Sequence, residues 1–250
     1  MRKMIINLKL TMESGQPPNF IWSKDGDKYF RYIGGEKCYI WEDNGLRCTE
    51  GFEDYVLKLL RGSDDLNAVY KKISTDAVTK QAIKKYSGLR VTLSDPWETL
   101  VCFICSVNNN IPRIRRNVQS LMREGRVLTP EEILRADLSR CCLGFREKFL
   151  RETAELALSY DLEKIGKTDY KTAKQVLMEL PGVGAKVADC ALLYGYGVLQ
   201  AFPIDVWIQR AMEKYYRKKK PAEIRKFAEE RWGSCAGYAN TYLYAAVRGI

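Results

Sequence analysis

The chain has 250 residues, of which 41 are Lys or Arg, 31 are Asp or Glu and none is His, so its formal net charge is +10. With 46% hydrophobic and 29% charged residues, it has the composition of a globular protein with a sizeable core and one to three domains. The absence of histidine excludes Ser-His-Asp and Cys-His nucleophile systems, a histidine general base and histidine-ligated metals. The positive surplus is typical of proteins that bind polyanions, and equally of proteins whose lysines are only solvated.

Residues 1 to about 50 have the pattern of short strands separated by turn signals. The predicted strands cover residues 5–10, 20–22, 29–33 and 38–41, and turns are expected at Asp25-Gly26-Asp27, Gly34-Gly35 and Asp43-Asn44-Gly45. Because the connections are short, this region is expected to form an antiparallel meander. The first run alternates apolar and polar residues, which favours a strand over a signal peptide.

A helical pattern begins after residue 50 and continues to the C-terminus. The first amphipathic helix has Phe52, Val56 and Leu60 on one face and is expected to end near Gly62. Another helix starts at Asp95-Pro96-Trp97-Glu98, with Asp95 as the N-cap residue, proline at the first helical position and glutamate three residues after the cap. The basic run at 217–220 is interpreted as a solvated helix end.

These patterns predict an α+β protein with a small N-terminal antiparallel sheet domain followed by two mostly helical subdomains. We expect the sheet domain at 1–62, a helical segment at 63–98 that packs with the C-terminal helices, a helical domain at 99–204 and a C-terminal helical segment at 205–250. No run approaches the roughly 18–20 apolar residues of a membrane span. The eight cysteines predict buried free thiols. The single C-x-x-C at 102–105 does not indicate zinc, no four-cysteine cluster lies near the C-terminus, and we expect no metal or cofactor.

Residues 171–194 predict two helices joined by a tight glycine turn, Pro181-Gly182-Val183-Gly184. Glycine permits backbone angles closed to other residues and lets another backbone approach. The N–H groups at the start of the second helix, next to Gly184, would form an anion site suited to one DNA phosphate. Any two packed helices can also be joined by a glycine-rich turn, so a purely structural role stays open.

Lys186 falls in the first turn of that second helix, where the positive end of the macrodipole disfavours an ammonium group and favours the neutral amine. A neutral lysine is a nucleophile that forms Schiff bases with sugar carbonyls. The alternative is an ion pair with Asp189, three residues further along. Asp205 follows the extended segment at Pro203 and is expected to cap a helix. In that position it could also stabilise cationic charge that develops on a sugar.

Taken together, the motifs resemble those of the 8-oxoguanine DNA glycosylase/AP lyase family of the helix-hairpin-helix DNA glycosylase superfamily. The resemblance spans nearly the whole chain. Its five separated segments are Ser14-Gly15-Gln16, FICSVNNNI at 103–111, LGFR at 143–146, LPGVGAKVADC at 180–190 with a following Pro-Ile-Asp-Val at 203–206, and AGYAN at 236–240.

The resemblance implies that Lys186 attacks the sugar C1′ and that Asp205 steadies the oxocarbenium-like transition state. It implies a base pocket in which the Gly15 carbonyl accepts the N7 proton of 8-oxoguanine, Cys190 and Tyr244 sandwich the flipped base, and Asn240 reads its Watson–Crick edge. The partner would be double-stranded DNA containing an oxidised base, bound by a monomer. The protein would be intracellular, cytoplasmic and nucleoid-associated in a prokaryote or nuclear in a eukaryote.

The resemblance also assigns residues that hold the rest of the DNA. Asn108, Arg113 and Arg146 match the residues that hold the unpaired cytosine, and Phe145 takes the wedge position, which is normally tyrosine. Gly182, Gly184 and Trp207 match phosphate-side positions. The alternatives are structural: the asparagines at 108–110 could cap or bend a helix, Phe145 could be core, and Arg113 could pair with a carboxylate.

Three positions depart from the family pattern: Asn240 replaces glutamine, Tyr244 replaces phenylalanine and Trp207 replaces histidine. The first two leave the preferred lesion open, so a glycosylase for another oxidised base is an alternative. A helix-hairpin-helix module that binds DNA without catalysis is another, although the combination of Lys186 and Asp205 argues against it.

Overall fold

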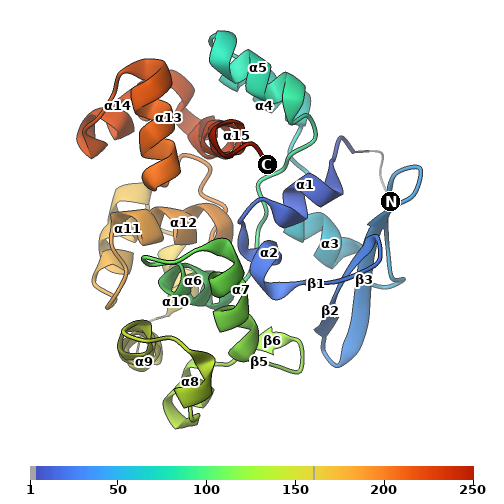
Figure 1. The fold of residues 1–250 in the computed structure, drawn as a ribbon, viewed down its shortest axis with the longest axis vertical. Coiled ribbons are helices and arrows are strands. Elements are labelled where there is room, and N and C mark those ends of the chain that lie inside the picture. The colour runs from blue at the N-terminus through green and yellow to red at the C-terminus, as the bar shows by residue number, and fades with distance from the viewer. Residues whose placement is uncertain (1–3, 160) are drawn as a thin grey trace.

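The protein is described by a computed structural model over residues 4–159 and 161–250. A four-stranded antiparallel sheet of strand order β1-β2-β3-β4 lies near the N-terminus, and helices form most of the rest (Figure 1). The strands are β1 (Ser23–Asp25), β2 (Lys28–Ile33), β3 (Glu36–Glu42) and β4 (Leu46–Cys48), with a two-stranded hairpin of β5 (Met122–Arg123) and β6 (Arg126–Val127). This arrangement confirms the predicted α+β class.

The helices follow the order of the chain. The first group is α1 (Leu8–Glu13), α2 (Pro17–Ile21), α3 (Glu53–Leu59), α4 (Leu66–Ile73), α5 (Ala77–Lys85), α6 (Pro96–Cys105), α7 (Ile111–Ser120) and α8 (Pro130–Arg135). The second group is α9 (Arg146–Ala157), α10 (Leu162–Ile165), α11 (Tyr170–Met178), α12 (Ala185–Gly195), α13 (Val206–Tyr216), α14 (Pro221–Trp232) and α15 (Ala236–Arg248). Short 3₁₀ turns lie at η1 (Ser139–Cys141) and η2 (Gly233–Cys235).

The strands predicted at 5–10 and 20–22 are wrong, because these segments belong largely to α1 and α2. Asn7 caps α1 by accepting a hydrogen bond from the Leu10 backbone N–H at 2.9 Å, and Leu8 and Met12 are buried on one helical face. Pro17 occupies the first position of α2. Runs this short fit a period of two and a period of 3.6 almost equally well, so only burial decides between them. The strands predicted at 29–33 and 38–41 are confirmed as parts of β2 and β3.

Helix α6 connects the sheet to the helical part of the molecule. Its start is as predicted, since the Asp95 carboxylate accepts from the Glu98 backbone N–H at 2.9 Å. The Glu98 side chain does not complete a capping box, because it forms a buried ion pair of 2.9 Å with Arg31 on β2. A second Glu98 contact, from the Val127 N–H at 3.2 Å, joins the β5–β6 hairpin to the same point.

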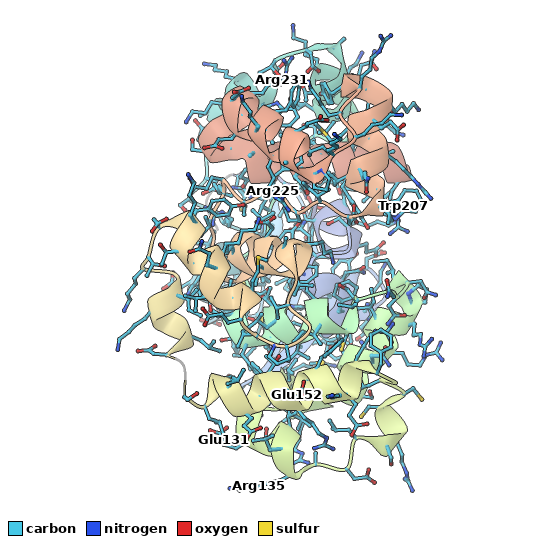
Figure 2. All side chains as sticks on the ribbon, turned by 90° about the vertical axis from the view of Figure 1, so that its left-hand side faces the viewer. Glu131, Arg135, Glu152, Trp207, Arg225 and Arg231 are labelled. Carbon is cyan, nitrogen blue, oxygen red and sulfur yellow. The ribbon has the colours of Figure 1, made fainter. Side chains whose placement is uncertain are left out.

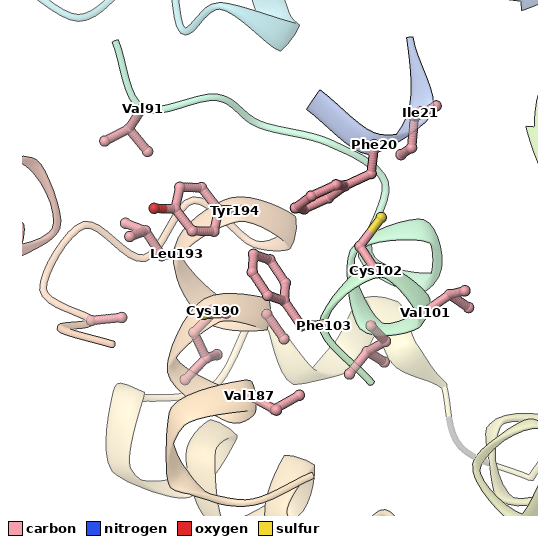
Figure 3. Close-up of a cluster of buried hydrophobic side chains, with 14 of the residues drawn as sticks. Phe20, Ile21, Val91, Val101, Cys102, Phe103, Val187, Cys190, Leu193 and Tyr194 are labelled. Carbon is pink, nitrogen blue, oxygen red and sulfur yellow. The ribbon is translucent and has the colours of Figure 1, made fainter. Parts of the chain in front are cut away.

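A cluster of buried hydrophobic side chains lies where α6 packs on α12 (Figure 3). The rings of Phe103 and Tyr194 stack at 5.6 Å between centroids, with an interplanar angle of 18°. Apolar side chains surround them, which fixes the two helices without directional bonds. The packing places the C-terminal end of α6 beside the N-terminal end of α12.

Helices α4 and α5 pack on α15, far along the chain. The Tyr70 and Tyr242 hydroxyls are 2.9 Å apart, and Tyr238 donates to Asp64 at 2.8 Å. The eight cysteines are free, and all are buried except the half-buried Cys48 and the exposed Cys142. Within the described ranges 4–159 and 161–250, no helix combines the length and the apolar character that crossing a membrane requires.

Candidate active site

A cavity of about 730 Å³ opens among five parts of the chain: the α1–α2 connection, the α6–α7 turn, the start of α12, the start of α13 and the last turns of α15. Ten of the predicted site residues line it. They are Gly15, Asn108, Gly182, Gly184, Lys186, Cys190, Asp205, Trp207, Asn240 and Tyr244. Arg113, Phe145 and Arg146 do not line it. The fold therefore gathers residues from near both ends of the chain, Gly15 and Tyr244 among them, into one concave site.

The predicted helix–hairpin–helix is confirmed as α11 and α12 with a tight turn between them. Gly182 has φ +76°, and a Cβ there would lie 2.8 Å from the Phe149 side chain. A hydrogen bond of 2.8 Å from the Thr153 hydroxyl on α9 to the Pro181 carbonyl holds the turn against α9. Gly184 is the N-cap of α12 and offers no side-chain acceptor, so the first N–H groups of α12 have no capping side chain.

The Lys186 amine lies against the end of α6. Its Nζ donates to the Ser106 Oγ at 2.9 Å and lies 4.9 Å from the centre of the Phe103 ring. Ser106 in turn donates to the Phe103 carbonyl at 2.6 Å, so its lone pairs are left to face the lysine. Sequence reasoning missed Ser106 and Phe103 as partners of the lysine, because only the α6–α12 packing brings them together.

The alternative ion pair between Lys186 and Asp189 is wrong. Asp189 is buried against α11, where its carboxylate pairs with Lys174 at 2.6 Å and accepts from the Tyr170 hydroxyl at 2.7 Å. These bonds satisfy the acid on the side away from the cavity. Among the described residues, Lys186 has no carboxylate within 4.0 Å.

Asp205 is the N-cap of α13, as predicted. Its Oδ1 accepts from the backbone N–H groups of Trp207 at 3.0 Å and Ile208 at 2.8 Å. The approaching segment is held by Asn240, whose Nδ2 donates to the Pro203 carbonyl at 2.8 Å. The helix end thus fixes a carboxylate on the wall of the cavity that Lys186 also lines.

The four residues predicted for the base pocket all line the cavity, and two of them, Gly15 and Tyr244, lie next to each other. Gly15 has φ +82°, and a Cβ there would lie 3.3 Å from both the Ile111 Cδ1 and the Tyr244 hydroxyl. That hydroxyl accepts from the Arg248 Nη1 at 2.9 Å. Cys190 is buried, and burial raises its thiol pKa to about 12, so it is a neutral thiol near pH 7.

Phe145 and Arg146, assigned to the wedge and the opposite base, contact each other outside the cavity lining. Arg146 is buried and donates to the carbonyls of Val107 at 2.7 Å, Asn108 at 2.7 Å and Leu143 at 3.1 Å. Its guanidinium lies 4.5 Å from the Phe145 ring, which is 52% exposed, so Phe145 is not core.

Asn108 has φ +48°, and Arg146 stabilises this turn by binding its backbone. Asn110 caps α7, so the structural interpretation of the asparagine run is correct for that residue. Arg113 is exposed on α7, and no carboxylate of the described residues lies within 4.0 Å of its side chain.

Residues 1–100 match a family model described as "8-oxoguanine DNA glycosylase, N-terminal domain". A "Probable N-glycosylase/DNA lyase" of Methanothermobacter thermautotrophicus is 34% identical, covering 97% of this chain and 93% of that protein. An "N-glycosylase/DNA lyase" of Saccharomyces cerevisiae is 29% identical over 78% of this chain and 66% of its own length.

Two solved structures extend the similarity to three dimensions. MBOgg1 in complex with a low-affinity DNA ligand superposes with a TM-score of 0.88 and 33% identity, covering 98% of this chain and 92% of that one. The Clostridium acetobutylicum 8-oxoguanine glycosylase/lyase, bound to duplex DNA with cytosine opposite 8-oxoguanine, superposes with a TM-score of 0.86 and 25% identity. The match covers 98% of this chain and 93% of that one. The chain belongs to the 8-oxoguanine DNA glycosylase/lyase family of the helix-hairpin-helix superfamily.

Proposed function

We propose that the protein is a bifunctional DNA glycosylase/AP lyase that excises 8-oxoguanine from duplex DNA, preferably opposite cytosine, with Lys186 as the nucleophile. One observation carries this proposal: the Lys186 amine lies on the wall of a cavity of about 730 Å³ that Asp205 also lines, and no carboxylate of the described residues pairs with it. The volume lies within the range of about 300–1,000 Å³ that is typical of small-molecule sites.

The chemistry requires a nucleotide outside the helix, because the sugar C1′ of a stacked nucleotide is not accessible. The Nζ lone pair forms a bond to C1′ while the C1′–N9 bond breaks, and the base leaves with the bonding electrons and takes up a proton. Nζ then gives up one proton, and the C1′–O4′ bond breaks as O4′ takes up a proton, which leaves the opened sugar as a protonated Schiff base on Nζ. Loss of a C2′ proton then breaks the C3′–O3′ bond and cleaves the strand.

Asp205 would lower the barrier electrostatically. Its carboxylate is held by two backbone N–H groups at 3.0 and 2.8 Å, so it needs little reorganisation when positive charge develops on the sugar. A fixed carboxylate of this kind stabilises the transition state more than the neutral substrate, which is the requirement for catalysis.

Discrimination against guanine would come from the Gly15 end of the cavity. The N7 of 8-oxoguanine carries a proton and the N7 of guanine carries a lone pair, so a carbonyl facing N7 accepts a hydrogen bond only from the lesion. With guanine the two acceptors face each other unpaired, which costs about 1–3 kcal/mol. The Tyr244 hydroxyl beside Gly15 and the short Asn240 side chain support the second candidate, a different oxidised base.

The DNA itself would be held outside the cavity. The uncapped N–H groups of α12 suit one phosphate, and the exposed Phe145 ring suits the space that the flipped base leaves. Arg113 and the Asn108–Arg146 turn would contact the orphaned cytosine. The substrate requires a compartment that contains DNA.

A base-release assay tests this proposal. Duplexes carrying 8-oxoguanine, guanine or an oxidised pyrimidine, each opposite all four bases, are incubated with wild type, with Lys186→Gln and with the exposed-lysine control Lys80→Gln. We expect release of 8-oxoguanine, fastest opposite cytosine, by wild type and Lys80→Gln only. Release of only the oxidised pyrimidine would show that this base, and not 8-oxoguanine, is the substrate. DNA binding without release of any base would favour a helix-hairpin-helix module that binds DNA without catalysis.

A further inference from the structure

Two arginines lie against one tryptophan at the edge of the cavity. The guanidinium carbon of Arg210 is 5.0 Å from the centre of the Trp207 ring, and that of Arg248 is 5.4 Å from it. Trp207 and Arg210 come from the first turns of α13, and Arg248 from the last turn of α15. Trp207 and Arg248 line the cavity, and Figure 2 shows Trp207 at the outer edge of the molecule.

The charges of these two arginines are not compensated. Within the described part of the chain, no carboxylate lies within 4.0 Å of either side chain. Other arginines of this protein do have such partners: Arg61 pairs with Asp64 at 2.7 Å, and Arg231 pairs with Asp76 at 2.8 Å. Two cations held on one ring repel each other, so the arrangement is suited to binding an anion between or beside them.

The indole ring also orients the two guanidinium groups. A guanidinium packed on an aromatic ring is attracted by the ring quadrupole and keeps its N–H edge free for hydrogen bonds. Arg248 is further fixed because its Nη1 donates to the Tyr244 hydroxyl at 2.9 Å. Trp207 itself contributes no backbone donor here, since its N–H is already bonded to Asp205 at 3.0 Å. The ring is therefore a platform, and the arginines supply the donors.

We propose that Arg210 and Arg248, held on the Trp207 ring, bind a backbone phosphate of the DNA strand whose nucleotide enters the cavity. The ligand is a phosphodiester because it is the anion that must lie at this rim when a nucleotide is turned into the cavity. Guanidinium groups match the oxygen geometry of phosphate and form charge-assisted bonds with it. This inference rests on the proposed function, since it takes duplex DNA as the substrate.

The salt dependence of DNA affinity measures such a contact. Each phosphate that a protein neutralises contributes about 0.9 to the slope of log K against log salt for duplex DNA. All variants are made in the Lys186→Gln background, so that a duplex carrying 8-oxoguanine is bound but not cut. We expect Arg210→Gln with Arg248→Gln to weaken binding about tenfold or more and to reduce the slope by about one.

Matched variants separate this contact from a structural role. Arg210→Lys with Arg248→Lys keeps both charges and should retain the slope, and Lys80→Gln removes a positive charge from α5 and should not change it. Arg210 is exposed and makes no hydrogen bond with the described residues, so Arg210→Gln alone provides a variant that stays folded if the double variant does not. That single variant should also bind more weakly with a smaller slope.

The outcomes are distinct from those of the proposed function. An unchanged slope in Arg210→Gln and in the double glutamine variant, with intact duplex binding by the parent, would overturn the phosphate contact alone. If the variants lose affinity but keep the parent's slope of log K against log salt, the two arginines have a structural role. That result would also overturn the phosphate contact. A parent that does not bind the duplex at any salt concentration would instead remove the proposed function.

Discussion

Asp189 and Lys174 form a buried ion pair of 2.6 Å between α12 and α11, although Lys186 lies less than one turn away from Asp189 on the same helix. The pair ties together the two helices of the hairpin. It also keeps the acid away from the amine that the proposed mechanism needs as a nucleophile.

Asp189→Asn should therefore lower stability and leave the chemistry of the folded enzyme intact. Removing one partner of a buried ion pair leaves an uncompensated charge and costs about 3–5 kcal/mol. Urea unfolding measures the loss. The double variant Lys174→Met with Asp189→Leu removes both charges and should recover much of it. Wild-type stability in Asp189→Asn together with a loss of base release would instead make Asp189 a partner of the reaction.

Ser106→Ala should slow base excision without weakening DNA binding. The variant removes the acceptor that holds the lysine Nζ at 2.9 Å, so the amine samples more orientations before it attacks. We expect single-turnover excision to fall about tenfold, from a loss near 1.4 kcal/mol in the transition state, while the dissociation constant for duplex stays the same. Ser106→Thr keeps a hydroxyl and should recover part of the rate. A rate equal to that of wild type in Ser106→Ala would show that this hydrogen bond does not position the amine.

Gly15→Ala should abolish lesion excision by narrowing the pocket. Its Cβ would lie 3.3 Å from the Ile111 Cδ1 and the Tyr244 hydroxyl, and the φ of +82° is unfavourable for alanine. Gly34→Ala is a matched control, because Gly34 has φ +60° and no atom within 4 Å of an added Cβ. Both variants should lose similar stability of about 1 kcal/mol, but only Gly15→Ala should stop excision. Equal activity in both would place the base pocket elsewhere.

Asp76 makes part of the stability dependent on pH. Burial raises the pKa of its carboxyl, but hydrogen bonds from Thr79 and Tyr216 and the charge of Arg231 outweigh this effect, and the net pKa is lowered. An acid with a lowered pKa stabilises the fold above its unfolded pKa of about 3.9, and this contribution is lost as the pH falls through the folded value. Asp76→Asn keeps a capping side chain, so it should cost about 1 kcal/mol at pH 7. In urea unfolding the difference from wild type should shrink below pH 4, and a constant difference would contradict this account.

The sequence predicted those parts of the fold that local chemistry determines. Asp95 and Pro96 define the start of α6, and Pro181 and the two glycines define the turn before α12. It failed for the segments that form α1 and α2, because a run of five or six residues does not establish a period.

The sequence predicted which residues form the site, but it did not predict the contacts between them. Ten of the predicted site residues line one cavity, yet the Ser106 bond to Lys186 and the two arginines on Trp207 depend on helices that meet only in the folded chain. Arg146 shows the same limit, because the motif gives no sign that its guanidinium also binds three carbonyls of its own protein. Tertiary packing decides such contacts, and no local pattern encodes them.

Borohydride trapping identifies the residue that attacks the sugar, because it reduces the Schiff base to a stable covalent bond. Wild type is incubated with an 8-oxoguanine duplex in the presence of borohydride, and the cross-linked peptide is located by mass spectrometry. We expect a covalent adduct on Lys186 in wild type and in Lys80→Gln, and none in Lys186→Gln. An adduct on a different residue, or an undiminished yield from Lys186→Gln, would contradict it.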